Sequence, residues 1–201
     1  MFTGIVTELG TAVAVEETGS GSRITIAAPR TRPGMKIGDS VAVNGVCLTA
    51  VALDGDTISV EAVGETLARS NLGVLVTGAV VDLERPMSGD GRFDGHIVQG
   101  HVDGVGEIIS IEAEGDARRL RIVTPGSGRY LVEKGSITVD GVSLTITAVA
   151  DVNDDQQWFE IVLIPHTLEV TVLGRRHAGE RVNLEFDVIA KYVERLMEDR
   201  R

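Results

Sequence analysis

Apolar residues recur in short runs, in which β-branched side chains alternate with polar ones and turn residues interrupt each run. Four such runs in the first half predict strands: Arg23–Ala27, Ser40–Val43, Val46–Leu53 and Thr57–Val63. The pairs Asn44-Gly45 and Asp54-Gly55 stand between runs, and such pairs favour tight hairpins because both residues tolerate positive φ. Short strands at a spacing of about ten residues predict a small antiparallel barrel rather than a βαβ sheet.

The same pattern predicts how each unit ends. Val80–Arg85 and Val182–Phe186 have the alternation of closing strands, and Glu65–Asn71 and Thr167–Leu173 predict one or two helical turns. The tail differs, because Asp187 is a candidate N-cap and apolar residues then follow at helical spacing. The apolar stripe comprises Ile189, Tyr192, Val193 and Leu196, and the opposite face carries Glu194, Arg195, Glu198 and Asp199. This stripe either packs on its own chain or joins helices of several chains, and the pattern alone favours neither.

The chain is an internal duplication. Residues 2–6 return as residues 98–102, an offset of 98 − 2 = 96. Residues 43–49 return as residues 139–145 with the same offset, 139 − 43 = 96. Residues 78–84 return as residues 179–185, with an offset of 179 − 78 = 101, so the second copy has about five extra residues. We therefore predict barrels at residues 1–88 and 89–186, a linker near residues 87–91, and a helix at 187–201. Two related folds carry two related pockets.

Composition narrows the function classes. The formal net charge of −11 argues against nucleic acid as a partner, because phosphate binding relies on clustered Lys and Arg. Cys47 is the single cysteine, so an intrachain disulfide is excluded and a reducing compartment is expected. The apolar runs are short, and residues 1–8 lack the pattern of a signal peptide. We expect a cytoplasmic protein with no membrane-spanning segment.

Several motifs, in order and in both halves, resemble the riboflavin synthase family of the alpha type. They are residues 1–6 (MFTGIV), 44–49 (NGVCLT) and 140–145 (DGVSLT), 95–102 (GHIVQGHV), 163–168 (LIPHTL) and the terminal helix. The resemblance covers essentially the full chain. It implies an all-β fold of two tandem six-stranded antiparallel Greek-key barrels related by duplication, plus a C-terminal α-helix.

The resemblance also implies an activity. Two molecules of 6,7-dimethyl-8-ribityllumazine react, and transfer of a four-carbon unit gives riboflavin and 5-amino-6-(D-ribitylamino)uracil. No metal or other cofactor is expected. The family implies a homotrimer held by its terminal helices, with each active site between the N-terminal barrel of one chain and the C-terminal barrel of a neighbour. On that basis the apolar stripe is interpreted as a trimer seam. An association with lumazine synthase is left open.

Five residues are candidates for catalysis by this resemblance: Ser143, His101, Cys47, Thr145 and Asp187. Ser143 and Cys47 occupy equivalent repeat positions, where small core residues are the ordinary alternative. Ser143 is expected to act as a nucleophile or to orient an attacking water. His101 suits proton transfer, because imidazole is a common general acid and base, although a structural histidine is the alternative. Asp187 either caps the helix or also takes part in the site.

Other residues are expected to bind substrate. Lys134 would meet a ribityl hydroxyl or a carbonyl, or be a solvated surface cation, and Phe2 would cover a pocket or pack in the core. Thr49 and Thr145 would line the two pockets, whereas His96 is interpreted as structural. The first pocket is assigned Gly4, Ile5, Val6, Cys47, Leu48, Thr49, Glu61, Ala62, Val63, Gly64, Glu65 and Thr66. The second is assigned Gly100, His101, Val102, Lys134, Ser143, Leu144, Thr145, Val162, Leu163, Ile164, Pro165, His166 and Thr167.

One position departs from the family pattern: His166 stands where the first copy has Glu65. Two alternatives to the enzyme remain. A non-catalytic relative that binds lumazine or flavin as a light-emitting antenna would need only one working pocket. A plain β-barrel interaction module would need no paired polar positions. Because both halves keep polar residues at equivalent positions, the sequence favours the enzyme.

Overall fold

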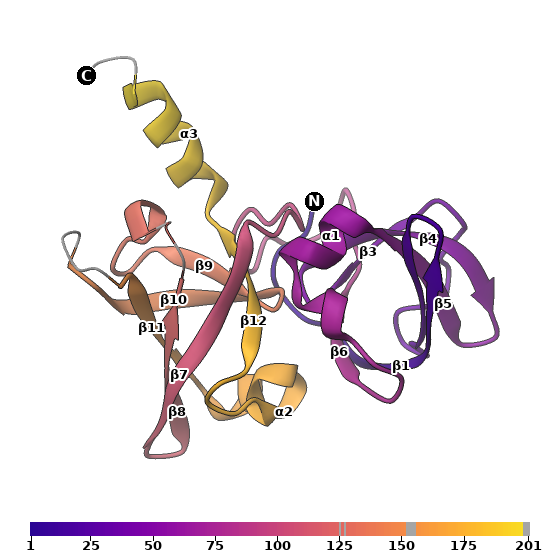
Figure 1. Ribbon diagram of the computed structural model, residues 1–201, viewed down its shortest axis with the longest axis horizontal. Helices are drawn as coiled ribbons and strands as arrows, with labels where there is room; N and C mark the ends of the chain where they lie inside the picture. The colour runs from indigo at the N-terminus through magenta and orange to yellow at the C-terminus, as the bar shows by residue number, and fades with distance from the viewer. Residues whose placement is uncertain (125, 127, 152–155, 199–201) are drawn as a thin grey trace.

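A computed structural model describes residues 1–124, 126, 128–151 and 156–198. Within these residues, twelve strands form two closed antiparallel barrels that lie side by side (Figure 1). The strand order of the first barrel is β1-β2-β5-β4-β3-β6, and the second repeats it as β7-β8-β11-β10-β9-β12. The predicted fold of tandem six-stranded barrels is therefore confirmed.

The strand bounds match the predicted runs closely. The first barrel comprises β1 (Glu8–Thr18), β2 (Gly21–Ala27), β3 (Ser40–Val43), β4 (Val46–Asp54), β5 (Thr57–Val63) and β6 (Val80–Glu84). The second comprises β7 (Gly104–Glu114), β8 (Ala117–Val123), β9 (Ser136–Val139), β10 (Val142–Val149), β11 (Trp158–Leu163) and β12 (Arg181–Phe186). The hairpin residues Asn44 and Asp140 both adopt positive φ, at 45° and 47°.

The duplication extends to irregularities of the strands. The register of β1 shifts between Ala12 and Ala14, and that of β7 shifts between Ile108 and Ser110, which are the same repeat positions. A second pair of shifts lies in β4 and β10. Bulges bend a strand locally, so matched bulges give the two barrels the same curvature.

Each barrel has its own apolar core. The first core includes Ile24, Ile58 and Leu83, and the second includes Ile122 and Phe159, all at most 1% exposed. Alternate residues of each strand face inward, so the intervening residues, Cys47 among them, face outward. Any pocket for a ligand therefore lies on the outer surface of a barrel.

Short helices follow the fifth strand of each barrel: α1 (Gly64–Arg69) and α2 (Pro165–Val170), continued by the 3-10 turns η1 (Asn71–Val74) and η3 (Val172–Arg175). A further 3-10 turn, η2 (Gly128–Tyr130), precedes β9. The terminal helix α3 (Val188–Glu198) projects from the second barrel (Figure 1). The predicted domain boundary after residue 88 falls in the connection from β6 to β7 and stays a prediction. The end of the predicted terminal segment, residues 199–201 with Asp199, lies outside the described residues.

Candidate functional site

Two short straps join the barrels; we define them as residues 2–6 (first strap) and residues 98–102 (second strap). They run antiparallel where Phe2 N–H donates to Val98 O at 2.7 Å and Val98 N–H donates to Phe2 O at 3.3 Å. Phe2 and Val98 are at most 1% exposed and pack with Ala42 between the barrels. Phe2 is therefore a core residue in this chain, and its side chain does not cover an open pocket.

Each strap crosses to the opposite barrel. The backbone oxygen of Gly4 accepts a hydrogen bond from Ser143 N–H at 2.8 Å, and that of Gly100 accepts one from Cys47 N–H at 2.9 Å. Val6 packs against the core of the second barrel, and Val102 packs against the core of the first. Each barrel is thus completed by the strap that precedes the other barrel's strands.

The crossing depends on glycine at two equivalent positions. Gly4 and Gly100 have φ of 77° and 78°, a region that favours glycine. A Cβ at Gly4 would lie 2.6 Å from Ser143 Cβ, and one at Gly100 would lie 2.6 Å from Cys47 Cβ. These contacts are too close for any other residue without movement of the strap.

Two buried carboxylates, those of Glu84 and Glu185, bind backbone N–H groups of the two straps. Glu84 accepts hydrogen bonds from Thr3 N–H at 2.7 Å, Thr3 Oγ1 at 2.8 Å and Gly4 N–H at 3.0 Å. Glu185 accepts from Gln99 N–H at 2.7 Å and Gly100 N–H at 2.9 Å. Burial raises the pKa of both carboxyl groups, and the hydrogen bonds oppose that rise.

The sequence reasoning missed these two glutamates. The available signal was the repeat itself, because Glu84 and Glu185 are equivalent at the offset of 185 − 84 = 101. Acidic residues at the end of two closing strands gave no reason to expect burial, which became evident only from the strap contacts.

The predicted grouping of strap residues was wrong. It placed Gly4, Ile5 and Val6 with Cys47, and Gly100, His101 and Val102 with Ser143. The crossing reverses both assignments, because the Gly4 carbonyl binds the Ser143 strand and the Gly100 carbonyl binds the Cys47 strand. A repeat relates residues by position, whereas the straps are exchanged in space.

The first recess lies outside the first barrel, beside Cys47. It has a volume of about 200 Å³. Its lining comes from β4, α1 and the second strap: Val46, Cys47, Glu65, Thr66, Arg69, Ser70, Gly100, His101 and Val102. Cys47 is half-buried, His101 is exposed, and Glu65 forms an ion pair with Arg69 along α1. This recess therefore combines an apolar wall with a thiol, an imidazole and a charged pair.

Ser143 contacts His96, a histidine for which the sequence predicted only a structural role. Ser143 Oγ lies 2.7 Å from His96 Nδ1, and His96 Nε2 lies 3.2 Å from Thr138 Oγ1. Thr138 is 1% exposed on β9, so it is a fixed partner for the ring. A neutral imidazole satisfies both contacts by accepting from the Ser143 hydroxyl and donating to Thr138. The Ser143 hydroxyl, the His96 imidazole and the Thr138 hydroxyl thus stand in series.

Burial lowers the pKa of His96, and the nearby Asp187 carboxylate opposes that shift. The lowered pKa keeps the imidazole neutral and able to take a proton near neutral pH. Asp187 Oδ1 also accepts from Ile189 N–H at 2.9 Å, so its predicted role as the N-cap of α3 is confirmed. His96 lies before the second repeat motif, and this position predicted only a structural role.

The remaining predicted site residues divide by exposure. Leu48, Ala62 and Leu163 are at most 6% exposed, so their side chains belong to the barrel cores. Leu144 also packs on the second core. Exposed positions are Ile5, Thr49, Glu61, Val63, Gly64, Lys134, Thr145, Ile164, Pro165 and His166, and half-buried ones are Thr66, Val162 and Thr167.

Beside the second barrel, a groove of about 580 Å³ runs between the first strap and α2. Val6, Thr7, His166 and Glu169 contribute to its lining. His166 thus occupies, on α2, the position that Glu65 occupies on α1. Lys134 adopts positive φ, at 65°, and its N–H donates to Ile146 O at 2.8 Å, which fixes it by its backbone on the second barrel.

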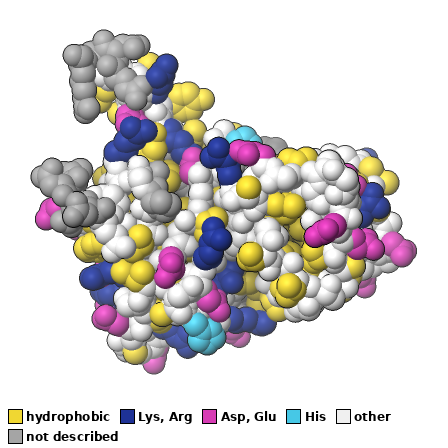
Figure 2. Space-filling view, viewed as in Figure 1, with side chains coloured by type: hydrophobic (Ala, Val, Ile, Leu, Met, Phe, Trp, Pro, Cys, Tyr) yellow, Lys and Arg dark blue, Asp and Glu magenta, His cyan; other side chains and the backbone are white. Residues whose placement is uncertain are grey.

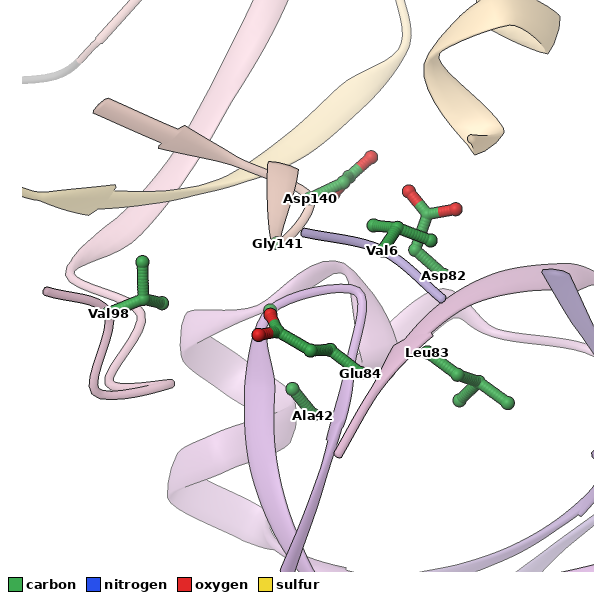
Figure 3. Close-up of a pocket in the computed structure, with 9 residues that line it drawn as sticks. Val6, Ala42, Asp82, Leu83, Glu84, Val98, Asp140 and Gly141 are labelled. Atoms are coloured by element: carbon green, nitrogen blue, oxygen red, sulfur yellow. The ribbon is translucent and has the colours of Figure 1, made fainter. Parts of the chain in front are cut away.

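A buried polar network joins the barrels between the straps. Asp82 and Asp140 line a cavity of about 10 Å³, and in Figure 3 their carboxyl groups lie on the same side of Val6, with Glu84 on the other. That volume holds about one water. Arg176 donates to Asp140 Oδ2 at 2.7 and 3.1 Å, whereas Asp82 Oδ2 has no hydrogen-bond partner among the described residues. Burial raises the pKa of Asp82 well above its usual range.

The described residues form neither a cluster of metal ligands nor a helix that could span a membrane. Among the described residues, His, Cys, Asp and Glu do not gather in any group of three that could hold a metal ion. In the same part of the chain, the helices are too short or too polar to cross a membrane.

Comparison with known proteins agrees with this architecture. The family model described as lumazine binding domain matches the chain twice, at residues 3–86 and 99–187. The solved structure of LumP complexed with flavin mononucleotide has a TM-score of 0.80 and 24% identity, covering 92% of this chain and 99% of that one. That likeness shows the shared fold.

Curated relatives extend over nearly the whole chain. The riboflavin synthase of Mycobacterium tuberculosis (strain ATCC 25618 / H37Rv) is 50% identical over 199 residues, 98% of each chain. The riboflavin synthase of Bacillus subtilis (strain 168) is 40% identical over 198 residues, 98% of this chain and 90% of the relative. With two lumazine-binding repeats, two barrels of one strand order and such relatives, the chain belongs to the riboflavin synthase family of transferases.

Proposed function

We propose that this chain converts two molecules of 6,7-dimethyl-8-ribityllumazine into riboflavin and 5-amino-6-(D-ribitylamino)uracil. The observation that carries the proposal is the twofold construction of one recess, with a crossing strap, a glycine carbonyl and an outward Cys47 or Ser143. Two sites built from the same repeat positions suit two copies of one substrate. The two products together contain the atoms of the two substrates, so no outside oxidant or reductant is required.

Positioning would supply much of the rate. Holding two reactants in register can contribute about 7–11 kcal/mol in well-oriented cases. The recess beside Cys47, at about 200 Å³, is smaller than typical small-molecule sites of about 300–1,000 Å³. We propose that a neighbouring chain completes it, with the Ser143 side of the second barrel facing the Cys47 side of the first. Both sides present exposed groups on the outside of a barrel, as such an arrangement requires.

The terminal helix supports a trimer. Ile189, Tyr192, Val193 and Leu196 are 50–72% exposed along α3. Hydrophobic side chains are also visible on the projecting segment (Figure 2). An apolar stripe of this kind is covered when like helices pack together. We propose that α3 forms the seam of a homotrimer.

The Ser143–His96 pair would provide the acid–base chemistry. The Ser143 hydroxyl, or a water that it orients, adds to an electron-poor ring carbon of one lumazine while His96 Nδ1 takes the proton. His101, in the Cys47 recess, would exchange a proton with the acidic 7-methyl group of the other lumazine. Asp187 stabilises the charge that develops on His96, as its opposing effect on the His96 pKa indicates.

The other proposed contacts follow from exposure. Thr49 and Thr145 would hydrogen-bond ring or ribityl oxygens, and Lys134 would meet a ribityl hydroxyl. Val63 and Ile164, which are exposed just before α1 and α2, would contact the substrates at equivalent points. A cytoplasmic location and an association with lumazine synthase stay predictions.

The direct test is to incubate the purified protein with 6,7-dimethyl-8-ribityllumazine and to separate the products by chromatography. We expect riboflavin and the ribitylaminouracil in equal amounts. Tight binding of one lumazine or flavin per chain without product would instead support the antenna function.

Ser143→Ala and His96→Gln test the pair. We expect both to lower kcat by about 10²–10⁴, the usual contribution of general acid–base catalysis. Their effects should be non-additive in the double variant, because the two groups act together. Ser88→Ala changes an exposed serine in the linker and is the control. Unchanged kcat in both single variants would exclude this role.

Leu196→Arg tests the seam, because it places a charge on the most exposed position of the stripe. Light scattering should show loss of the trimer, and riboflavin formation should fall with it. Ile37→Arg is the control, since Ile37 is 69% exposed on the first barrel, far from α3 in sequence. A fully active monomer would refute an active site shared between chains.

A further inference from the structure

One ion pair connects α3 to the end of the second strap. Lys191 Nζ contacts both oxygens of Asp103, at 2.7 and 2.5 Å. Lys191 and Asp103 are 24% and 28% exposed in their side chains, so the pair is partly exposed to water. Asp103 Oδ2 also accepts from Phe186 N–H at 2.8 Å, which fixes the carboxylate against the end of β12.

Asp103 follows directly after the second strap. Its N–H donates to Leu184 O at 2.8 Å, while at the other end of the strap Glu185 binds Gln99 N–H and Gly100 N–H. Burial raises the pKa of Glu185 and the positive charge of Lys191 opposes that rise, so the same ammonium group also acts on that carboxylate. One cation therefore stabilises the carboxylates at both ends of the strap.

His101 lies between these two anchors. His101 is exposed. Within the described part of the chain, its imidazole forms no hydrogen bond. Its position in the Cys47 recess therefore depends on Gly100 and Val102 on either side. Val102 packs on the first barrel, whereas the anchors at Glu185 and Asp103 belong to the second barrel and its connection.

We propose that Lys191 is a positioning residue for the Cys47 recess: through Asp103 it fixes the strap that carries His101, and so links α3 to that recess. The effect on catalysis rests on the function proposed above, whereas the effect on the strap does not. The link joins two separate parts of the molecule: α3 projects from the second barrel (Figure 1), whereas the Cys47 recess lies on the first.

The chain offers a reporter that is independent of catalysis. Cys47 is the single cysteine and lies half-buried under the Gly100 carbonyl. The rate at which iodoacetamide alkylates the Cys47 thiol therefore reports on how tightly the second strap packs beside it. Four proteins are compared: the wild type, Lys191→Met, Lys191→Arg and Lys36→Met, the last removing an exposed lysine of the first barrel.

We expect Lys191→Met to speed alkylation of Cys47 by about two- to fivefold, the range of a partly exposed ion pair. Lys191→Arg should restore the wild-type rate, and Lys36→Met should not change it. Raising the salt concentration should speed alkylation of the wild type toward the Lys191→Met rate, since salt screens the pair. A fifth protein, Asp103→Asn, keeps an acceptor for Phe186 N–H and should behave like Lys191→Met.

In the riboflavin assay, Lys191→Met and Asp103→Asn should raise KM by a similar factor and change kcat less, with the mass of the assembly unchanged. Equal alkylation rates in all four proteins would overturn the proposal, even if the wild type makes riboflavin. If alkylation responds as expected but the wild type makes no riboflavin, the strap link stands and the proposed function fails.

Discussion

Asn183 joins the two barrels through one buried side chain. Its Oδ1 accepts from Asn71 N–H at 2.6 Å, and its Nδ2 donates to Asn44 O at 2.8 Å and to Asn71 Oδ1 at 2.9 Å. Asn183 is on β12 of the second barrel, whereas Asn44 and Asn71 belong to the first. All three are at most 7% exposed, so water does not readily replace these bonds.

Asn183→Ala removes all three hydrogen bonds. Two backbone groups, Asn71 N–H and Asn44 C=O, then lose these bonds inside the protein. Each unsatisfied buried group costs about 1–3 kcal/mol, so the free energy of unfolding should fall by about 2–6 kcal/mol. A water in the vacated space would recover part of that cost, and we expect a value in the lower half of the range. Small domains are stable by only about 5–15 kcal/mol, so this loss is large.

Urea unfolding followed by two signals measures the effect. Fluorescence of Trp158, the single tryptophan, reports on the second barrel, and far-UV circular dichroism reports on both. We expect coincident transitions in the wild type and separate ones in Asn183→Ala, because the variant weakens the contact between barrels. Ser59→Ala removes one hydrogen bond within the first barrel and is the control, expected to cost about 1 kcal/mol or less. A loss below about 1 kcal/mol with coincident transitions in Asn183→Ala would refute the reasoning.

Two further substitutions test the buried carboxyl and the strap crossing. Burial raises the pKa of Asp82, so the folded protein holds a proton that the unfolded chain releases above its ordinary pKa of about 4. Wild-type stability should therefore fall as pH rises from that value through the folded pKa, and Asp82→Asn should lack this slope. A difference in unfolding free energy that does not change with pH would contradict this. Gly100→Ala adds a Cβ 2.6 Å from Cys47 Cβ, whereas Gly78→Ala, at φ of 90°, meets no atom within 4 Å. In urea unfolding, Gly100→Ala should lower the free energy of unfolding by about 1–3 kcal/mol more than the Gly78→Ala control does. Equal losses would show that the strap moves to make room for the added Cβ.

The repeats made the fold predictable. Hairpin pairs such as Asn44-Gly45 fixed strand ends, and the constant offset required two copies of one topology. The strands β1 and β7 were not predicted: β1 is rich in Ala, Thr and Glu, and β7 combines adjacent isoleucines with Gly and Glu, so neither has a strong apolar alternation. Their place in the barrels comes from pairing with β2, β6, β8 and β12, which is a tertiary effect.

The site was only partly predictable, for a physical reason. A strap that packs on its own barrel and one that crosses to the other have the same sequence and the same repeat position. The crossing is decided by long-range contacts such as Gly4 O with Ser143 N–H, which no local pattern encodes. His96 was missed for a related reason, since its partner Ser143 lies 143 − 96 = 47 residues away on a different strand.

The buried network did leave a signal in the sequence. The first copy has Asn44 and Asp82 where the second has Asp140 and Asn183, so amide and acid are exchanged between the copies. In each copy the Asx side chain after the third strand accepts the N–H of its partner, at 2.8 Å in both. An exchange of this kind keeps the hydrogen bonds while changing where the charge lies.

The crossing of the straps limits how the two copies can diverge. Because each recess is closed by the other barrel's strap, neither barrel keeps its recess if the two separate, and the interface must be maintained while the recesses change. Substitutions at strap positions that face outward, such as Ile5 and His101, alter a recess without touching the interface. Substitutions at Gly4 and Gly100 would disturb both. The two recesses can therefore acquire different polar groups for two different roles in one reaction, while the crossing that builds them stays symmetric.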